Sequence, residues 1–222
     1  MTLPEHAPRG EVVRRIEAEG IIPIVRAATP DIALRAARAV MAGGVSVFEI
    51  TMTVPDATEV IRALVQELGD RAVIGAGTVL SAAAAHQCVD AGAAFIVSPG
   101  LDGDTVVEAH ARGVPAMPGA LTPTEVIAAS RLGADMVKIF PVSAVGGAGY
   151  LRALRGPLPD VKLLPTGGIN AANAAEFFAA GASAIGIGSE LVDAKALAEG
   201  RDAVVTERAR ALRAAVQAAR GH

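Results

Sequence analysis

Short runs of apolar residues alternate along the chain with longer amphipathic segments of helical spacing. Residues 21–25 form a compact apolar run of strand length. The next segment opens with Thr29-Pro30, a helix N-cap followed by proline at the first helical position, and stops at Gly43-Gly44. This unit recurs, and the pattern predicts further strands at 45–51, 72–75, 94–98, 114–117, 135–140, 161–164 and 184–187.

The amphipathic segments predict helices at 11–19, 30–41, 55–68, 81–91, 104–111, 123–132, 149–154, 171–180 and 201–220. Polar residues predicted to cap four of them are Thr29, Ser81, Thr122 and Asn170. Apolar strands that alternate with helices indicate a parallel sheet covered by helices. About eight such units predict an α/β fold of the (β/α)8 barrel type, preceded by an N-terminal helix.

No linker or change of composition divides the chain, so we expect one domain over residues 1–222. Its parts would be a helix at about 11–19, a barrel at about 20–192 and a C-terminal helix at about 201–220. The rival fold is an open doubly wound sheet, which would need a dinucleotide fingerprint after the first strand. Arg26-Ala27-Ala28-Thr29 is not such a fingerprint.

Composition narrows the classes of function. Hydrophobic residues make up 52% of the chain and charged residues 19%, which is typical of a globular protein. A net charge of −3 and 3% aromatic residues argue against a nucleic-acid surface. The single cysteine, Cys88, cannot form an internal disulfide, and the polar N-terminus resembles no signal peptide. No apolar run is long enough to span a bilayer uninterrupted, so we expect a cytoplasmic protein that contacts no membrane.

Two ionisable residues stand inside apolar strands. Lys138 lies within Met136-Val137-Lys138-Ile139-Phe140, and burial there would favour the neutral amine, which is a nucleophile toward carbonyl groups. The alternative is a lysine whose ammonium reaches past the strand end into water. Glu49 occupies a similar position on the second predicted strand, and Lys138 on the sixth. Alternate strands of a barrel contribute to the same interior layer, so the two side chains can meet, as an active site or as a structural ion pair.

Further candidates lie at the carboxyl ends of the predicted strands, where barrel enzymes place their active sites. Thr166-Gly167-Gly168 follows the seventh strand and Gly188-Ser189 the eighth, where glycine loops commonly bind phosphate. The same glycines would also suit tight turns. Arg26 ends the first strand, as a carboxylate partner or an exposed loop residue, and Thr78 ends the third.

Metal and Ser-His chemistry lack support in the sequence. His86 and His110 fall in predicted helices, and His6 and His222 near the termini. No His, Cys and carboxylate cluster has metal-ligand spacing, and no serine stands in a nucleophile elbow.

Taken together, these segments resemble the family of 2-keto-3-deoxy-6-phosphogluconate (KDPG) and 2-keto-4-hydroxyglutarate (KHG) aldolases over roughly residues 20–192. The matching segments include Phe48-Glu49-Ile50-Thr51, Gly75-Ala76-Gly77-Thr78, Ser98-Pro99-Gly100, Val137-Lys138-Ile139-Phe140-Pro141 and Pro165-Thr166-Gly167-Gly168. The resemblance implies a class I aldolase that cleaves KDPG to pyruvate and D-glyceraldehyde 3-phosphate. It also implies a homotrimer, small-molecule substrates (a 2-keto acid and a phosphorylated aldehyde), no metal and no cofactor.

The resemblance assigns roles to individual residues. Lys138 would form the Schiff base and Glu49 would be the general acid and base. The other positions would bind substrate: Arg26 and Thr78 its carboxylate, Pro99, Phe140 and Thr166 its pyruvyl part, and Gly167, Gly168, Gly188 and Ser189 its phosphate. Some family members carry an arginine where this chain has Thr53, so the carboxylate falls to Arg26, with Thr53 nearby.

The substrate and the reaction class keep alternatives. Another aldol of the same family, 4-hydroxy-2-oxoglutarate or 2-keto-3-deoxy-6-phosphogalactonate, could be preferred over KDPG. A phosphosugar isomerase or epimerase on the same barrel would use Glu49 without a covalent step. A barrel without activity that serves as a scaffold is the third alternative, and the Lys138, Glu49 and Thr78 set argues against it.

Overall fold

Most short strands of this chain are followed by a helix that returns the chain to the start of the next strand. The computed structural model describes residues 7–221, so the expectations for His6 and His222 lie outside the described residues. The strands are β1 Ile21–Val25, β2 Val47–Thr51, β3 Val73–Gly77, β4 Ile96–Val97, β5 Ala116–Met117, β6 Gly119–Ala120, β7 Val137–Ile139, β8 Leu163–Pro165 and β9 Ile185–Ile187.

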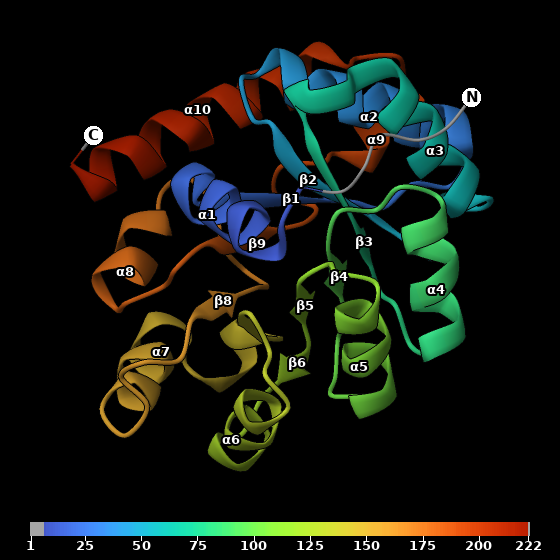
Figure 1. The fold of residues 1–222 in the computed structure, drawn as a ribbon. Coiled ribbons are helices and arrows are strands. Elements are labelled where there is room, and N and C mark those ends of the chain that lie inside the picture. The colour runs from blue at the N-terminus through green and yellow to red at the C-terminus, as the bar shows by residue number, and fades with distance from the viewer. Residues whose placement is uncertain (1–6, 222) are drawn as a thin grey trace.

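The helices lie on the outside of the strands, except α1 (Figure 1). They are α1 Arg9–Glu19, α2 Pro30–Ala42, α3 Ala57–Leu68, α4 Ala82–Asp90, α5 Gly103–Ala111, α6 Pro123–Arg131, α7 Gly147–Arg155, α8 Ala174–Ala179, α9 Ala194–Ala198 and α10 Ala203–Arg220. Two 3-10 turns, η1 Gly69–Arg71 and η2 Val142–Val145, complete the set. The short helix α9 is not among the helices that the sequence pattern predicts.

Side-chain caps fix the start of several helices. The predicted caps Thr29, Ser81 and Thr122 are confirmed, because each accepts a hydrogen bond from a backbone N–H of the first turn. The prediction that Asn170 caps the helix at 171–180 is wrong. Helix α8 begins at Ala174, after Asn173, and Asn170 Oδ1 instead accepts from Ala172 N–H in the preceding turn.

All paired strands are parallel, which confirms the predicted α/β class. Six form a curved sheet in the order β5-β4-β3-β2-β1-β9, and three form a sheet in the order β6-β7-β8. The pairing of the first strand with the last is absent from the doubly wound order. Isolated bridges link Leu163 to Ala182 and Thr166 to Gly186, between the β8 and β9 segments.

The strand predicted at 114–117 is followed by a proline and then by a second short strand that the sequence pattern did not predict. Pro118 stands between β5 and β6 and has no N–H to donate to a neighbouring strand. The chain continues beyond it as β6, whose Gly119 is in register with Lys138. The two sheets therefore meet along the chain at Pro118.

Two hydrophobic clusters flank the strands. The larger lies between strands and helices and contains residues such as Phe48, Ile50, Ile61 and Leu64. The smaller joins inward-facing strand residues to the apolar face of α1, and its members include Val12, Ile16, Phe95, Met117 and Met136. Helix α1 therefore covers the amino ends of the strands, and Figure 1 shows it lying across them. The carboxyl ends are the end that α1 leaves open.

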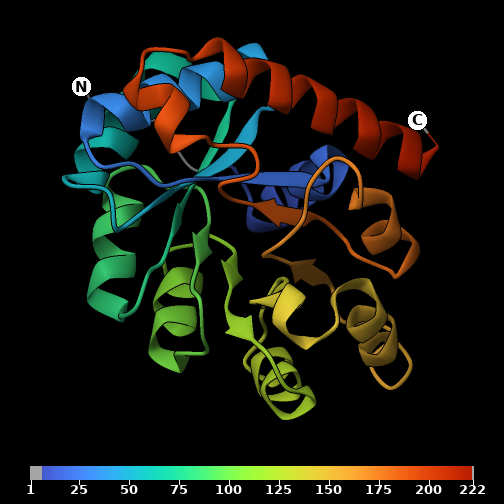
Figure 2. The ribbon, with the colours of Figure 1, turned by 180° about the vertical axis from the view of Figure 1, so that it is seen from behind.

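Helix α10 lies along the outside of the strands near α2 and α8 (Figure 2). Its close approach requires glycine, because a Cβ at Gly43 would overlap Ala209 of α10. Within residues 7–221, no helix combines the length and the apolar character needed to cross a bilayer.

Candidate active site

Two ionisable side chains are buried in the interior that the strands enclose. Glu49 in β2 is 1% exposed and Lys138 in β7 is 6% exposed. The alternative in which Lys138 reaches out to water is therefore wrong. Both residues stand in short apolar strands. They are buried because their apolar neighbours pack into the interior.

The carboxyl of Glu49 is held without a full set of partners. Among the described residues, Glu49 Oε1 has no hydrogen-bond partner, and no ion pair joins it to Lys138. Burial raises the pKa of Glu49, while the positive charges of Lys138 and Arg26 act in the opposite direction. Burial and these two positive charges therefore act on the Glu49 carboxyl in opposite directions, and burial has the larger effect.

Gly77 makes room for this carboxyl. It is in register with Thr51 on β2, and a Cβ at Gly77 would overlap the Glu49 carboxylate. We did not single out Gly77 as a site residue from the sequence. A glycine at the end of an apolar strand is the feature of the sequence that could have indicated this role, because such a glycine often marks the close approach of another group.

The next residue, Thr78, has a backbone φ of 58°. This left-handed conformation is costly for a β-branched residue, and such strain gathers at functional sites. Thr78 is half-buried at the carboxyl end of β3, whereas Thr53, after β2, is exposed and shares a 2.8 Å hydrogen bond with Thr51.

A pocket of about 610 Å³ opens at the carboxyl ends of β1, β7, β8 and β9. It brings together most of the predicted substrate-binding residues, namely Arg26, Phe140, Thr166, Gly167, Gly168, Gly188 and Ser189. Thr53, Thr78 and Pro99 are not part of its lining. The Lys138 Nζ lies 5.2 Å from the centroid of the Phe140 ring, which connects the buried lysine to this pocket.

Three backbone N–H groups in the loops that line the pocket have no protein acceptor within residues 7–221. In the described part of the chain, the N–H groups of Gly168, Ser189 and Glu190 donate to no protein oxygen. Gly167 and Gly168 have φ values of 103° and 72°, which favour glycine. Free N–H groups in such loops suit an anion.

Among the described residues, the charged side chains that line this pocket are Arg26 and Glu190. Arg26 is exposed and lies with the glycine loops rather than with Thr78. Glu190, also exposed, follows Ser189 and adds a negative charge that opposes an anion there.

Two other glycines allow backbone and side chains to pack closely around the site. A Cβ at Gly119 would overlap the Pro99 carbonyl, and one at Gly186 would overlap the Thr166 hydroxyl. Thr166 is buried, and its Oγ1 lies 3.4 Å from the Leu164 carbonyl oxygen. Pro99 and Thr166 thus keep fixed positions beside the strands that carry Lys138 and its neighbours.

Within residues 7–221, no group of three or more His, Cys, Asp or Glu side chains is arranged to hold a metal ion. Cys88 is buried on α4, its Sγ lies 3.3 Å from Met52 Sδ, and burial raises the pKa of its thiol to about 12.

The chain matches the family of KDPG and KHG aldolases over residues 12–207. It belongs to this family. The 2-dehydro-3-deoxy-phosphogluconate aldolase of Treponema pallidum is 37% identical to this chain, and the match covers 88% of this chain and 92% of that protein. The 2-dehydro-3-deoxy-6-phosphogalactonate aldolase of Escherichia coli is also 37% identical, over 77% and 83%.

A solved structure of similar shape is the KDPG aldolase of Legionella pneumophila with pyruvate captured as a covalent carbinolamine. It has a TM-score of 0.84 and 32% identity, and the match covers 90% of this chain and 97% of that one. The recognised family is thus confirmed, and its members are aldolases, which are lyases.

Replacing Glu49 with glutamine tests the cost of burying this carboxyl. Its folded pKa lies above the ordinary value of 4.5, so the folded state loses stability as pH rises through and above that value. We expect E49Q to melt at a higher temperature than the parent protein at about pH 7, and the gain to vanish below about pH 4. Calorimetric melting curves at both pH values measure this.

The matched control is Glu207→Gln, which changes an exposed carboxyl on α10. It should leave the melting temperature unchanged at both pH values. A Glu49→Gln variant that is no more stable than the parent at neutral pH would show that the Glu49 carboxyl is not held at a cost.

Proposed function

We propose that this protein is a class I aldolase that cleaves KDPG to pyruvate and D-glyceraldehyde 3-phosphate. The observation that carries the proposal is that Lys138 of β7 and Glu49 of β2 are both buried in the interior that the strands enclose. This interior lies next to a pocket with two glycine loops. A lysine amine can attack a ketone to form a Schiff base, and the amine of Lys138 lies in an apolar interior beside the pocket residue Phe140.

In the proposed mechanism, Lys138 Nζ attacks the C2 ketone and forms a carbinolamine, which loses water to give an iminium. The C3–C4 bond then breaks, and its electron pair enters the iminium to form an enamine. The proton of the C4 hydroxyl passes to Glu49 as the aldehyde leaves. Glu49 returns a proton to C3, and water releases pyruvate and regenerates the amine.

Glu49 fits both proton transfers because opposing effects act on it. Burial favours its protonated form, and the charges of Lys138 and Arg26 favour its ionised form. A carboxyl balanced in this way can accept and donate a proton within one cycle. Burial and the absence of a partner for Oε1 are the observations that support this role.

The other site residues divide between the two halves of the substrate. We place Thr78 and Arg26 at the keto-acid carboxylate, with Thr53 nearby, and Pro99, Phe140 and Thr166 at the pyruvyl part. Gly167, Gly168, Gly188 and Ser189 would bind the phosphate through free N–H groups. Within residues 7–221 the Glu190 carboxylate has no ion-pair partner, and its charge weighs against phosphate, which favours the unphosphorylated 4-hydroxy-2-oxoglutarate as an alternative substrate. The phosphorylated epimer, 2-keto-3-deoxy-6-phosphogalactonate, stays an alternative because the family resemblance includes it.

Trapping with borohydride tests the covalent step. We expect pyruvate and sodium borohydride to add one stable adduct to Lys138 and to abolish activity, because reduction fixes the Schiff base. The chain has only two other lysines, Lys162 and Lys195, so peptide mass spectrometry locates the adduct without ambiguity.

Lys162 is an internal control, because it stands in a similar sequence, Val161-Lys162-Leu163-Leu164-Pro165, but is 43% exposed and paired with Glu17. An unmodified Lys138 in active enzyme saturated with pyruvate would refute the proposal. Activity that survives Lys138→Arg would instead favour an isomerase or epimerase that uses Glu49 without a covalent step.

Arg26→Gln distinguishes the two anionic ends of the substrate. If Arg26 binds the carboxylate, the pyruvate concentration needed for half-maximal trapping should rise roughly tenfold, the loss expected for one charge-assisted hydrogen bond. The ratio of KM values for phosphorylated and unphosphorylated aldols should then stay the same. A change confined to that ratio would move Arg26 to the phosphate, beside the glycine loops with which it lines the pocket.

We propose that the two sheets act as one closed barrel of eight strands within a single domain. The supporting observations are the bridges from the β8 segment to the β9 segment and the chain continuity of β5 and β6 through Pro118. On this view β5 and β6 are two halves of one strand.

We also propose that the protein is a homotrimer, as the family resemblance implies. Exposed apolar side chains support some assembly: Leu80 is 65% exposed, Val107 60% and Leu132 40%. Sedimentation equilibrium should give about three times the 22.3 kDa mass of the chain. A monomer at micromolar concentration would contradict the proposal.

A further inference from the structure

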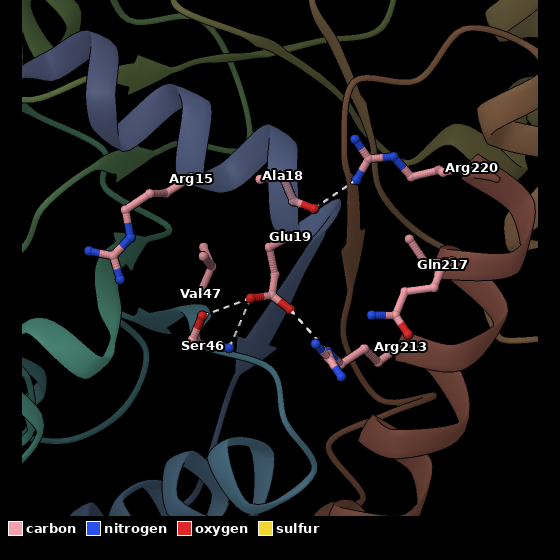
Figure 3. Close-up of a pocket in the computed structure, with 9 residues that line it drawn as sticks. Arg15, Ala18, Glu19, Ser46, Val47, Arg213, Gln217 and Arg220 are labelled. Carbon is pink, nitrogen blue, oxygen red and sulfur yellow. Dashed lines mark hydrogen bonds and ion pairs between the residues drawn. The ribbon is translucent and has the colours of Figure 1, made fainter. Parts of the chain in front are cut away.

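A second pocket, of about 520 Å³, lies at the end of the molecule opposite the candidate active site. Its walls are the last turns of α1 and α10 and the start of β2, so it opens beside the amino ends of the strands (Figure 3). None of its lining residues lines the pocket at the carboxyl ends. Whatever binds here would be separate from the proposed aldol chemistry.

Three arginines and one carboxylate are the charged groups of the lining. The arginines are Arg15 of α1 and Arg213 and Arg220 of α10, and the carboxylate is Glu19. Residues 213, 217 and 220 are three or four positions apart, so Arg213, Gln217 and Arg220 lie on one face of α10. The pocket therefore carries an excess of positive charge.

The carboxylate is already occupied by protein partners. Glu19 Oε2 accepts hydrogen bonds from the backbone N–H of Ser46 at 3.2 Å and from its hydroxyl at 2.7 Å. Arg213 Nε reaches Glu19 Oε1 only at 3.9 Å, the long end of an ion pair. Figure 3 shows the carboxylate between Ser46 and Arg213. It compensates the charge of Arg213 in part and leaves the other two arginines without a carboxylate in the pocket.

Each arginine is held in place yet keeps free donors. Arg220 donates to the Ala18 carbonyl at 2.9 Å, and its guanidinium carbon lies 5.6 Å from the centroid of the Phe178 ring. Arg15 donates to the Asp70 carbonyl at 3.2 Å. A guanidinium has five N–H donors, and within residues 7–221 these contacts use a minority of them.

Glycines set the position of two of these arginines. Gly20 ends α1 with a φ of 73°, and a Cβ there would lie 2.7 Å from Arg220 Nη1. Gly44 similarly leaves space for the Arg213 side chain, whose Cδ would lie 3.4 Å from an added Cβ. Arg15 and Arg220, which donate to backbone carbonyls, are therefore held in place before any ligand arrives, which lowers the entropic cost of binding.

We propose that this pocket binds a small multivalent anion, a molecule that carries two or more phosphate or carboxylate groups. Guanidinium groups bind both kinds of oxyanion with paired, charge-assisted hydrogen bonds. Three of them around one concave space bring like charges together, and an anion relieves that repulsion. The amide of Gln217 adds a neutral donor to the same space.

Isothermal titration calorimetry of the full chain tests this proposal with pyrophosphate and, separately, with citrate, at an ionic strength held constant with potassium chloride. We expect saturable binding of at least one probe. The double variant Arg15→Gln/Arg213→Gln should weaken that binding roughly tenfold or more, because it removes two charged donors. Arg220 is left intact because it also holds the end of α1.

The matched control is Arg131→Gln/Arg152→Gln, which removes the same charge from exposed residues of α6 and α7. It should bind the probes as the parent does. Ser189→Ala should also retain this binding, because it alters only the glycine-loop pocket. Glu19→Gln should tighten binding several-fold, because it removes the competing negative charge while an amide oxygen still accepts from Ser46.

Binding of pyrophosphate alone would assign a phosphate-bearing ligand, and binding of citrate alone a carboxylate-bearing one. The proposal is overturned if neither probe binds saturably, if both arginine pairs lose binding equally, or if Ser189→Ala abolishes it. Melting temperatures measured without anion verify that the double variant is folded. Its aldol turnover should match the parent, because both arginines are remote from Lys138.

Discussion

The burial of a lysine and a glutamate in one apolar interior is the constraint on which the rest of this structure depends. Isolated charges in such surroundings are costly, and here the two groups form no direct ion pair. The carboxyl of Glu49 even leaves one oxygen without a partner in the described residues. A buried polar atom without a partner requires an explanation, and a proton-transfer role supplies one.

The surrounding fold makes this burial feasible. Helix α1 fills the amino ends of the strands with Val12, Val13 and Ile16, so the interior is apolar at that end. At the other end, Gly77 leaves space for the Glu49 carboxyl. The same turn holds Thr78 in a strained conformation, which the rigid neighbouring strands must maintain. The strained backbone of Thr78 lowers the stability of the folded state, and it gives the polar groups at this end a defined arrangement.

The two ends of the strands differ in the way they present charge. At the carboxyl end, the backbone N–H groups of Gly168, Ser189 and Glu190 supply donors, and Arg26 and Glu190 supply the side-chain charges. At the amino end, side chains of α1 and α10 supply the charge, and backbone carbonyls hold the arginines in position. The first arrangement suits a ligand that must approach the strand ends closely. The second suits a ligand that stays at the surface.

Local sequence determined much of this protein. Apolar runs fixed the strands, and Thr29, Ser81 and Thr122 fixed helix starts, because a cap and the first turn lie within a few residues of each other. The prediction for Asn170 was wrong because a turn of its own competes for the same side chain. The order of the strands in the two sheets and the break between β5 and β6 at Pro118 depend on contacts with neighbouring strands. The local sequence pattern does not contain these contacts.

Lys138 and Lys162 also show the difference between what the local sequence determines and what the tertiary structure decides. Val137-Lys138-Ile139-Phe140-Pro141 and Val161-Lys162-Leu163-Leu164-Pro165 are alike in pattern, and hydrophobicity alone would bury both lysines. Lys138 lies within β7 and is buried, whereas Lys162 lies just before β8 and pairs with Glu17 of α1 at the surface. The sequence by itself placed a lysine at each strand. Only the tertiary structure decided that Lys138 is buried and that the side chain of Lys162 is partly exposed, because a shift of one or two residues along a strand changes the end and the face that a side chain occupies.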